Sequence, residues 1–147
     1  MSTSVVHEDP SPILQTAFAF WSSKVLLTAV EMKVFTKLAD RRMTGAELGK
    51  ELGLHARGIA DFFDALVAMK FLEREGNGAG SHYLNTRAGA MYLDESSPRY
   101  VGGILEMLNA RLFKFWQDLP TALRTGEPQN EVKHSQKPMF EELYSDL

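Results

Sequence analysis

The sequence predicts a mainly α-helical fold: a winged helix-turn-helix core with a small β-wing and additional N- and C-terminal helices. Two helical segments, 44–52 and 55–70, are joined by a turn at Gly53. Two short strand segments, 71–75 and 82–86, follow them and flank a glycine-rich turn. Helix, turn, helix and hairpin in this order are the elements of a winged helix.

The chain begins with a polar stretch, 1–12, that contains two prolines and is expected to be a flexible arm. The next segment, 13–38, has helical character, and its apolar residues cover more than one stripe along the helix surface. Such a helix needs apolar partners on two sides, and a second subunit can supply one of them. We therefore predict an intertwined homodimer, with an ordinary buried helix as the alternative. The candidate interface residues are Phe18, Phe20, Leu26, Leu27 and Val30.

The helix-turn-helix starts at a capping box, in which Thr44 caps the helix and Glu47 reaches back to it. Gly53 suits the position just after the first helix, because glycine adopts a positive φ without strain. The second helix has its apolar residues spaced for one face, which predicts that it packs against the body of the domain. These residues are Ile59, Phe62, Phe63, Leu66, Val67 and Met69.

Helical segments continue after the hairpin. A short helix is predicted over 87–93 and a longer one over 100–123, whereas 124–137 is polar and indicates an exposed loop. Pro138 suits the first position of a last helix. The predicted organisation is a flexible arm (1–12), a winged-helix dimerisation domain (13–123), and a polar loop with the start of a linker helix (124–147).

The second helix of the helix-turn-helix is poorly suited to reading DNA. Its outward positions are Arg57, Gly58, Asp61, Asp64 and Ala68. Two carboxylates there would repel a polyanion, and the net charge of −3 adds no attraction. We predict a protein-contact scaffold with no nucleic-acid partner, and interpret the Asp61–Asp64 pair as a solvated acidic face. A winged-helix transcription regulator remains the first alternative, because a small basic patch is available from Arg41, Arg42, Lys50 and Arg57.

Several other classes of protein are disfavoured by composition. The chain has no cysteine, which excludes disulfides and thiolate metal sites and favours a cytoplasmic location. None of the four histidines forms a closely spaced pair, so no metal site is predicted. No stretch reaches about 18 uninterrupted apolar residues, so no membrane partner is expected.

The glycine-rich turn at 76–80 resembles the phosphate-binding loops of nucleotide-binding folds only superficially. Arg74 stands where such a loop would carry an acidic residue, and a strand follows where a helix should open. We interpret this segment as a hairpin turn. The sequence therefore predicts no cofactor site and no catalytic residue in this chain.

Aromatic-rich helices offer a better candidate site. Flat apolar side chains with a cation among them are suited to a planar aromatic ligand. The candidates are Trp21, Met107, Arg111, Phe113, Trp116, Phe140 and Tyr144. Plain core and dimer packing is the alternative interpretation of the same residues.

Four motifs, taken together, resemble a known family. They are FWSSKVLLTAVE at 20–31, TGAEL at 44–48, DFFDALVAMKFL at 61–72 and YLNT at 83–86. Their order and spacing are similar to the N-terminal region of S-adenosylmethionine-dependent O-methyltransferases that act on plant phenolics, hydroxyindoles and bacterial polyketides. The resemblance covers about 13–147.

The resemblance implies an N-terminal dimerisation domain that also covers the substrate pocket. In that family a separate catalytic domain binds S-adenosylmethionine, and these 147 residues are expected to lead toward such a domain without containing it. The chain is then a homodimerising substrate-lid domain, not catalytic by itself, which meets a small aromatic hydroxyl compound in the full enzyme. A stand-alone aromatic-ligand-binding protein is the second alternative.

This sequence departs from the family at two turns. The family often has glycine where this chain has Lys33 and Lys70. Lysine at a position of positive φ would cost about 1 kcal/mol relative to glycine. Either the turns differ here, or the two lysines carry the strain.

Overall fold

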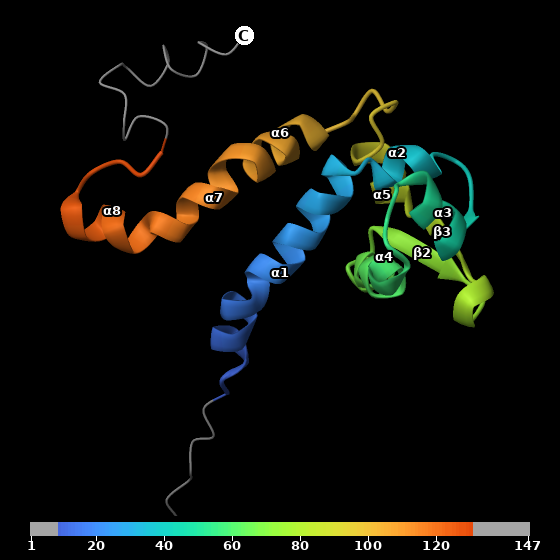
Figure 1. Ribbon diagram of the computed structural model, residues 1–147, viewed down its shortest axis with the longest axis horizontal. Helices are drawn as coiled ribbons and strands as arrows, with labels where there is room; N and C mark the ends of the chain where they lie inside the picture. Colours follow the sequence, from blue (N-terminus) through green and yellow to red (C-terminus); the bar gives the residue numbers. More distant parts are fainter. Residues whose placement is uncertain (1–8, 131–147) are drawn as a thin grey trace, which may run out of the picture. The chain divides into compact units, whose positions relative to one another are not determined.

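The computed structural model describes residues 9–130, and the chain divides into two units with the boundary between Gly102 and Gly103. Figure 1 shows the elements of both units, and each unit is described by itself. This boundary falls inside the segment 13–123, which was predicted as one domain. The predicted arm (1–12) is described only from residue 9, and a helix already begins at Ser11, inside the predicted arm.

The predicted helical segment 13–38 forms two helices, α1 (Ser11–Glu31) and α2 (Val34–Leu38). They are separated at Lys33, whose φ is 58°. The left-handed conformation there ends one helix and starts the next. An ion pair of 2.9 Å joins the Lys33 ammonium to the carboxylate of Glu95 and ties this junction to the loop after α5 (Arg87–Tyr92).

The capping box is confirmed at the start of α3 (Gly45–Glu51). The Thr44 hydroxyl accepts a hydrogen bond from the Glu47 amide at 3.2 Å, and the Glu47 carboxylate accepts one from the Thr44 amide at 2.8 Å. Gly53 has a φ of 67°, as its position after the helix requires. The next helix begins with a 3-10 turn, η1 (Ala56–Gly58), and continues as α4 (Ile59–Ala68).

Three antiparallel strands form the sheet, in the order β1-β3-β2. The wing consists of β2 (Leu72–Glu75) and β3 (His82–Asn85), joined through the short turn η2 (Gly78–Gly80). The third strand, β1 (Met43–Thr44), was not predicted. It pairs Met43 with Tyr83 and so attaches the start of the helix-turn-helix to the wing.

The core lies between α1, α2, α3, α4 and the sheet. Its fully buried large side chains are Val34, Phe35, Leu38, Leu48, Phe63, Leu66 and Leu72. The helix α5 (Arg87–Tyr92) covers α2 and β3, and its Gly89 allows close approach. A Cβ at Gly89 would lie 2.5 Å from the carbonyl oxygen of Phe71.

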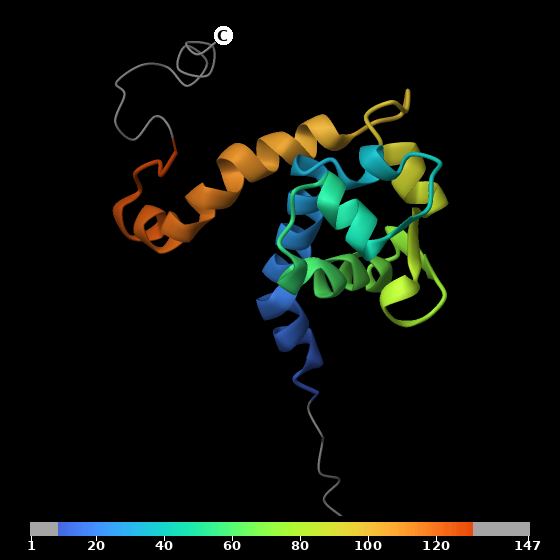
Figure 2. The same ribbon diagram turned by 45° about the vertical axis from the view of Figure 1, so that its right-hand side comes forward.

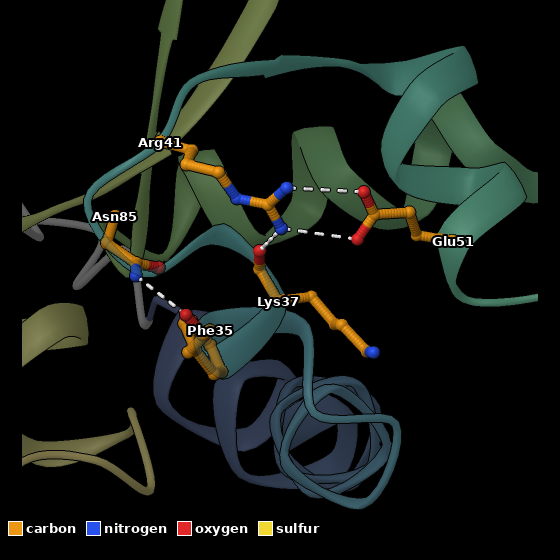
Figure 3. A network of polar contacts seen from close by, with 5 residues as sticks. All are labelled: Phe35, Lys37, Arg41, Glu51 and Asn85. Carbon is orange, nitrogen blue, oxygen red and sulfur yellow. Dashed lines mark hydrogen bonds and ion pairs between the residues drawn. The ribbon is translucent and has the colours of Figure 1, made fainter.

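Polar contacts hold the C-terminal end of α2 in place (Figure 3). The Asn85 amide donates hydrogen bonds to the carbonyl oxygens of Phe35 and Ala39, at 2.9 and 3.0 Å. The Arg41 guanidinium donates to the carbonyl oxygen of Lys37 and to both carboxylate oxygens of Glu51. These contacts satisfy carbonyl groups that a helix end leaves without partners, and they fix α2 against α3 and the wing.

The second unit is a helical run of changing type. It comprises α6 (Gly102–Met107), a π-helical turn η3 (Leu108–Leu112), α7 (Phe113–Phe115), a 3-10 turn η4 (Trp116–Asp118) and α8 (Leu119–Thr125). The predicted helix 100–123 is confirmed in position and extends two residues further, to a left-handed Gly126. The last helix predicted from Pro138 lies outside the described residues.

Candidate functional site

The N-terminal half of α1 presents an exposed aromatic surface. Phe18, Phe20 and Trp21 are 47%, 53% and 59% exposed. Ile13 and Leu14, which precede them on the same helix, are 73% and 47% exposed. Figure 1 and Figure 2 show this half of the helix extending beyond the rest of the first unit. An apolar surface of this kind marks a site of association.

The aromatic rings of α1 are stacked on one another. The ring centroids of Phe18 and Trp21 are 4.8 Å apart with the planes at 18°, and Phe20 meets Trp21 edge-on at 5.5 Å. The spacing of three residues between Phe18 and Trp21 brings their side chains together on a helix surface. Trp21, predicted for a ligand pocket, therefore belongs to the same surface as the interface candidates Phe18 and Phe20.

The C-terminal half of α1 is part of the core. Leu27, Ala29 and Val30 are 7%, 0% and 3% exposed, and Leu26 is partly exposed. Leu27 and Val30 were predicted as interface residues, but the chain's own core already covers them and little of their surface remains for a partner. The physical reason is their place along the helix, because only the C-terminal half of α1 packs on α2 and α4.

The predicted pocket residues of the second unit are spread along the helical run. Met107, Arg111 and Phe113 are half-buried, whereas Trp116 is 67% exposed. Met107 ends α6, Arg111 lies in the π-helical turn and Phe113 begins α7. Phe140 and Tyr144 lie outside the described residues.

The acidic face of α4 is tied to the wing through Asp64, whose side chain is 42% exposed and also paired. The Arg74 guanidinium contacts both carboxylate oxygens of Asp64, at 2.8 and 2.7 Å, and the Tyr83 hydroxyl donates to Asp64 at 2.8 Å. Burial, followed by the hydrogen bond to Asp64, raises the pKa of Tyr83. The hydrogen bond with Tyr83, followed by that with Asp64, raises the pKa of Arg74. Asp61, the other residue of the pair, is exposed.

This cluster affects the surface that a DNA-binding winged helix would use. The only arginine on the wing strands is paired with a carboxylate of α4, so it is not available for phosphates. Two arginines of the basic patch suggested by the sequence are also paired, Arg41 with Glu51 and Arg42 with Glu75. Among residues 9–130, no group of three or more histidine, aspartate or glutamate side chains is placed to hold a metal ion.

The winged-helix body, its internally paired charges and the projecting aromatic helix define a module for association with protein. The chain belongs to the O-methyltransferase dimerisation domain family, whose sequence pattern matches residues 14–95. This match confirms the resemblance and the predicted function as a dimerisation domain, and the transcription regulator and the stand-alone binding protein are not favoured.

Relatives with assigned functions agree with the family. The chain is 45% identical over 120 residues to the tetracenomycin polyketide synthesis 8-O-methyl transferase TcmO of Streptomyces glaucescens, covering 82% of this chain and 34% of that protein. It is 32% identical over 133 residues to a 3-hydroxy-5-methyl-1-naphthoate 3-O-methyltransferase of Streptomyces sahachiroi, covering 90% of this chain and 37% of that protein. The chain thus spans about a third of the length of these relatives.

A solved structure shows the same fold. Human N-acetylserotonin methyltransferase, in complex with SAM, matches with a TM-score of 0.75 and 29% sequence identity. The match covers 86% of this chain and 37% of that one. The winged-helix fold with added helices is therefore confirmed, including the helical region that follows the family match.

Proposed function

We propose that this chain forms the homodimerising, substrate-lid part of an S-adenosylmethionine-dependent O-methyltransferase that acts on a small aromatic hydroxyl compound. Transfer of the methyl group would occur on a catalytic region outside these 147 residues, which would bind the S-adenosylmethionine. The chain itself would supply apolar walls, subunit closure and exclusion of water, all of which help to position the reactants.

The exposed aromatic half of α1 is the single observation that carries the proposal. A stacked pair of rings with about half of its surface in water is unfavourable unless a partner covers it. The membership of the chain in a dimerisation family makes a second copy the simplest partner. In a two-fold dimer both copies contribute the same surface, so the exposed half of α1 in one copy would face the exposed half of α1 in the other.

A lipid bilayer is the other apolar environment to consider. By length and composition, α1 is long and apolar enough to cross a membrane. However, Leu27, Ala29 and Val30 are buried in the domain, and placing the whole helix in lipid would remove them from the core. We therefore assign the exposed half of α1 to a second copy, and the absence of a membrane partner stays a prediction.

The lid function rests on the chemical character of the candidate residues. Met107 and Phe113 offer apolar and aromatic surfaces, and Arg111 adds a cation that can stack on or hydrogen-bond to a phenolic ring. The relatives described above have names that include polyketide and hydroxynaphthoate O-methylation, which supports an aromatic hydroxyl compound as the substrate class. The cytoplasmic location predicted from the sequence is part of this proposal.

Sedimentation velocity tests the dimer directly. We expect a species of twice the 16.5 kDa chain mass at micromolar concentration. Phe20→Ala should raise the dimer dissociation constant by about 30-fold or more, as expected for an aromatic anchor. Asp61→Asn, an exposed change on α4, is the matched control and should leave the constant unchanged. A wild-type monomer at all concentrations would contradict the proposal.

Calorimetric titration tests the division of labour. The 147-residue chain should show no heat of binding with S-adenosylmethionine, because its described part contains no parallel strand–helix–strand unit to hold the cofactor. Tight uptake of the cofactor, or methyl transfer by the purified chain, would refute the assignment of chemistry to another region.

A further inference from the structure

The turn that follows α2 has a backbone conformation that is unusual for its residue. Ala39 has a φ of 48° and a ψ of −120°, and the Arg41 amide donates to the carbonyl oxygen of Leu38 at 2.7 Å. These features define a type II′ turn, whose second position has a positive φ and favours glycine. Ala39 carries strain there because its Cβ is crowded, and its ψ lies outside the left-handed region in which Lys33 is found.

A second unfavourable feature lies beside this turn, at Asn85 of β3. The amide nitrogen of Asn85 donates to the carbonyl oxygens of Phe35 and Ala39, at 2.9 and 3.0 Å. Because both partners are acceptors, the nitrogen has to face them and the side-chain oxygen has to face away. That oxygen is buried and has no hydrogen-bond partner within residues 9–130. A buried oxygen without a partner is unfavourable, so Asn85 suits this position through its two donations alone.

The turn is held from two sides (Figure 3). Asn85 holds it from the wing, and the Arg41 guanidinium, which bonds to the carbonyl oxygen of Lys37, holds it to Glu51 of α3. Strained residues persist only where their surroundings over-determine them, and they are frequent in switch regions. The strain at Ala39 is therefore maintained by contacts with elements distant in the sequence.

We propose that the turn Leu38–Arg41 is a latch that couples the wing to α2 and is held in its strained form by Asn85. With the wing in place, the two donations of Asn85 offset the strain at Ala39. When the wing moves away from α2, both donations are lost together, the turn relaxes to a negative φ at Ala39, and the C-terminal end of α2 is released. Asn85 is thus a positioning residue for α2.

The surroundings of the latch allow a local change of this kind. Asp40 and Arg41 are exposed and Ala39 is half-buried, so the turn can relax without opening the core, in which Leu38 is fully buried. Because α2 packs on α1, a displacement of the wing reaches the C-terminal half of α1 through the latch. All of these residues belong to the first unit, and the latch does not depend on the proposed homodimer.

Hydrogen exchange followed by nuclear magnetic resonance on the 147-residue chain tests the latch. The measured quantity is the exchange rate of the Arg41 amide, which closes the turn, relative to that of the Leu66 amide in the core helix α4. Asn85→Ala removes both donations and should raise this ratio by about 10-fold or more. Tyr83→Phe removes a hydrogen bond between the same strand and α4, and as the matched control it should leave the ratio unchanged.

Relief of the strain provides a second arm of the experiment. Ala39→Gly should raise the folding equilibrium constant by about 3-fold or more. Combined with Asn85→Ala, it should return the exchange ratio to within about 3-fold of the wild type, because glycine adopts the type II′ conformation without help. Lys70→Gly relieves strain outside the latch, at the end of α4, and should not restore the ratio.

An unchanged exchange ratio in Asn85→Ala overturns the inference. Equal recovery of the ratio with Ala39→Gly and with Lys70→Gly also overturns it, since the effect would then be one of general stability. If Asn85→Ala does not fold, Ala39→Gly alone decides the matter. A folding equilibrium constant below that of the wild type then overturns the inference, and a higher one supports it.

Discussion

Replacing Lys70 with glycine should stabilise the protein. Lys70 has a φ of 63° and follows the last residues of α4. Its amide donates to the carbonyl oxygen of Val67 and the amide of Phe71 donates to that of Leu66, at 2.9 and 3.0 Å. This pair of bonds is the Schellman motif, in which the residue at the position of Lys70 is usually glycine.

The magnitude follows from two opposing effects. A left-handed conformation costs a residue with a Cβ about 1–2 kcal/mol, which glycine avoids. Glycine also gives the unfolded chain more freedom, which costs about 0.4–1 kcal/mol of stability. We therefore expect Lys70→Gly to raise the free energy of unfolding by about 0.5–1 kcal/mol, because Lys70 is exposed and makes no ion pair among the described residues.

Urea unfolding followed by circular dichroism measures the effect, at one fixed protein concentration because a dimer's stability depends on concentration. Gly53 provides the matched control. It ends α3 with the same pair of bonds, from Gly53 to Lys50 and from Leu54 to Gly49, and a Cβ there would meet nothing within 4 Å. Gly53→Ala should lower the free energy of unfolding by a similar amount, since only the φ of 67° is at issue.

The substitution Lys33→Gly distinguishes the effect of backbone strain on stability from the effect of the side-chain charge. Its φ of 58° predicts a gain on replacement by glycine, but its ammonium pairs with Glu95. The pair is partly exposed and contributes about 0–1 kcal/mol, so Lys33→Gly should gain less than Lys70→Gly. The reasoning is refuted if Lys70→Gly lowers the free energy of unfolding, or if Gly53→Ala leaves it unchanged.

Three further outcomes are expected. Thr44→Ala removes the hydroxyl that accepts a hydrogen bond from the Glu47 amide and should lower the free energy of unfolding by about 1 kcal/mol. The backbone amide of residue 44 still donates to the Glu47 carboxylate, so nuclear magnetic resonance titration should show the lowered pKa of Glu47 returning only part of the way toward 4.5. Because folding raises the pKa of Tyr83, the contribution of this shift to the free energy of unfolding is complete below pH 10.0 and is lost as the pH rises through the pKa of the folded protein. In Tyr83→Phe, the urea midpoint should therefore fall less steeply at alkaline pH than in the wild type. Gly89→Ala should lower the thermal midpoint because the new methyl group meets a carbonyl oxygen, whereas Gly58→Ala has free space and should lower it less.

Local signals made much of the first unit predictable. The capping box, the left-handed Gly53 and the apolar face of α4 each depend on residues within one helix or turn, so they can be inferred from spacing alone. The strand β1 could not be inferred in this way. It has only two residues and exists because Met43 and Thr44 pair with β3, nearly forty residues later.

The interface candidates show a different limit. A helix that is apolar over most of its circumference indicates that partners are needed, but its sequence does not say which half meets the core. Leu27 and Phe18 carry the same apolar signal, yet the first is 7% and the second 47% exposed. The difference arises because α2 and α4 reach only one end of α1.

The irregular turns of the second unit also left no sequence signal. Neither proline nor glycine marks the π-helical turn, whose residues Leu108 to Leu112 are ordinary helix formers. Their apolar pattern was interpreted as one continuous helix. Only the backbone shows that the helix changes type at Leu108–Leu112 and again at Trp116–Asp118.

The two halves of α1 differ in whether the chain itself covers their apolar surface. In the first unit, the ion pair of Asp64 with Arg74 fixes the wing to α4, whereas the aromatic surface of the N-terminal half of α1 stays exposed. Burying such surface between two copies contributes roughly 25 cal/mol per Å², so association can offset the strain retained at Lys33 and Lys70.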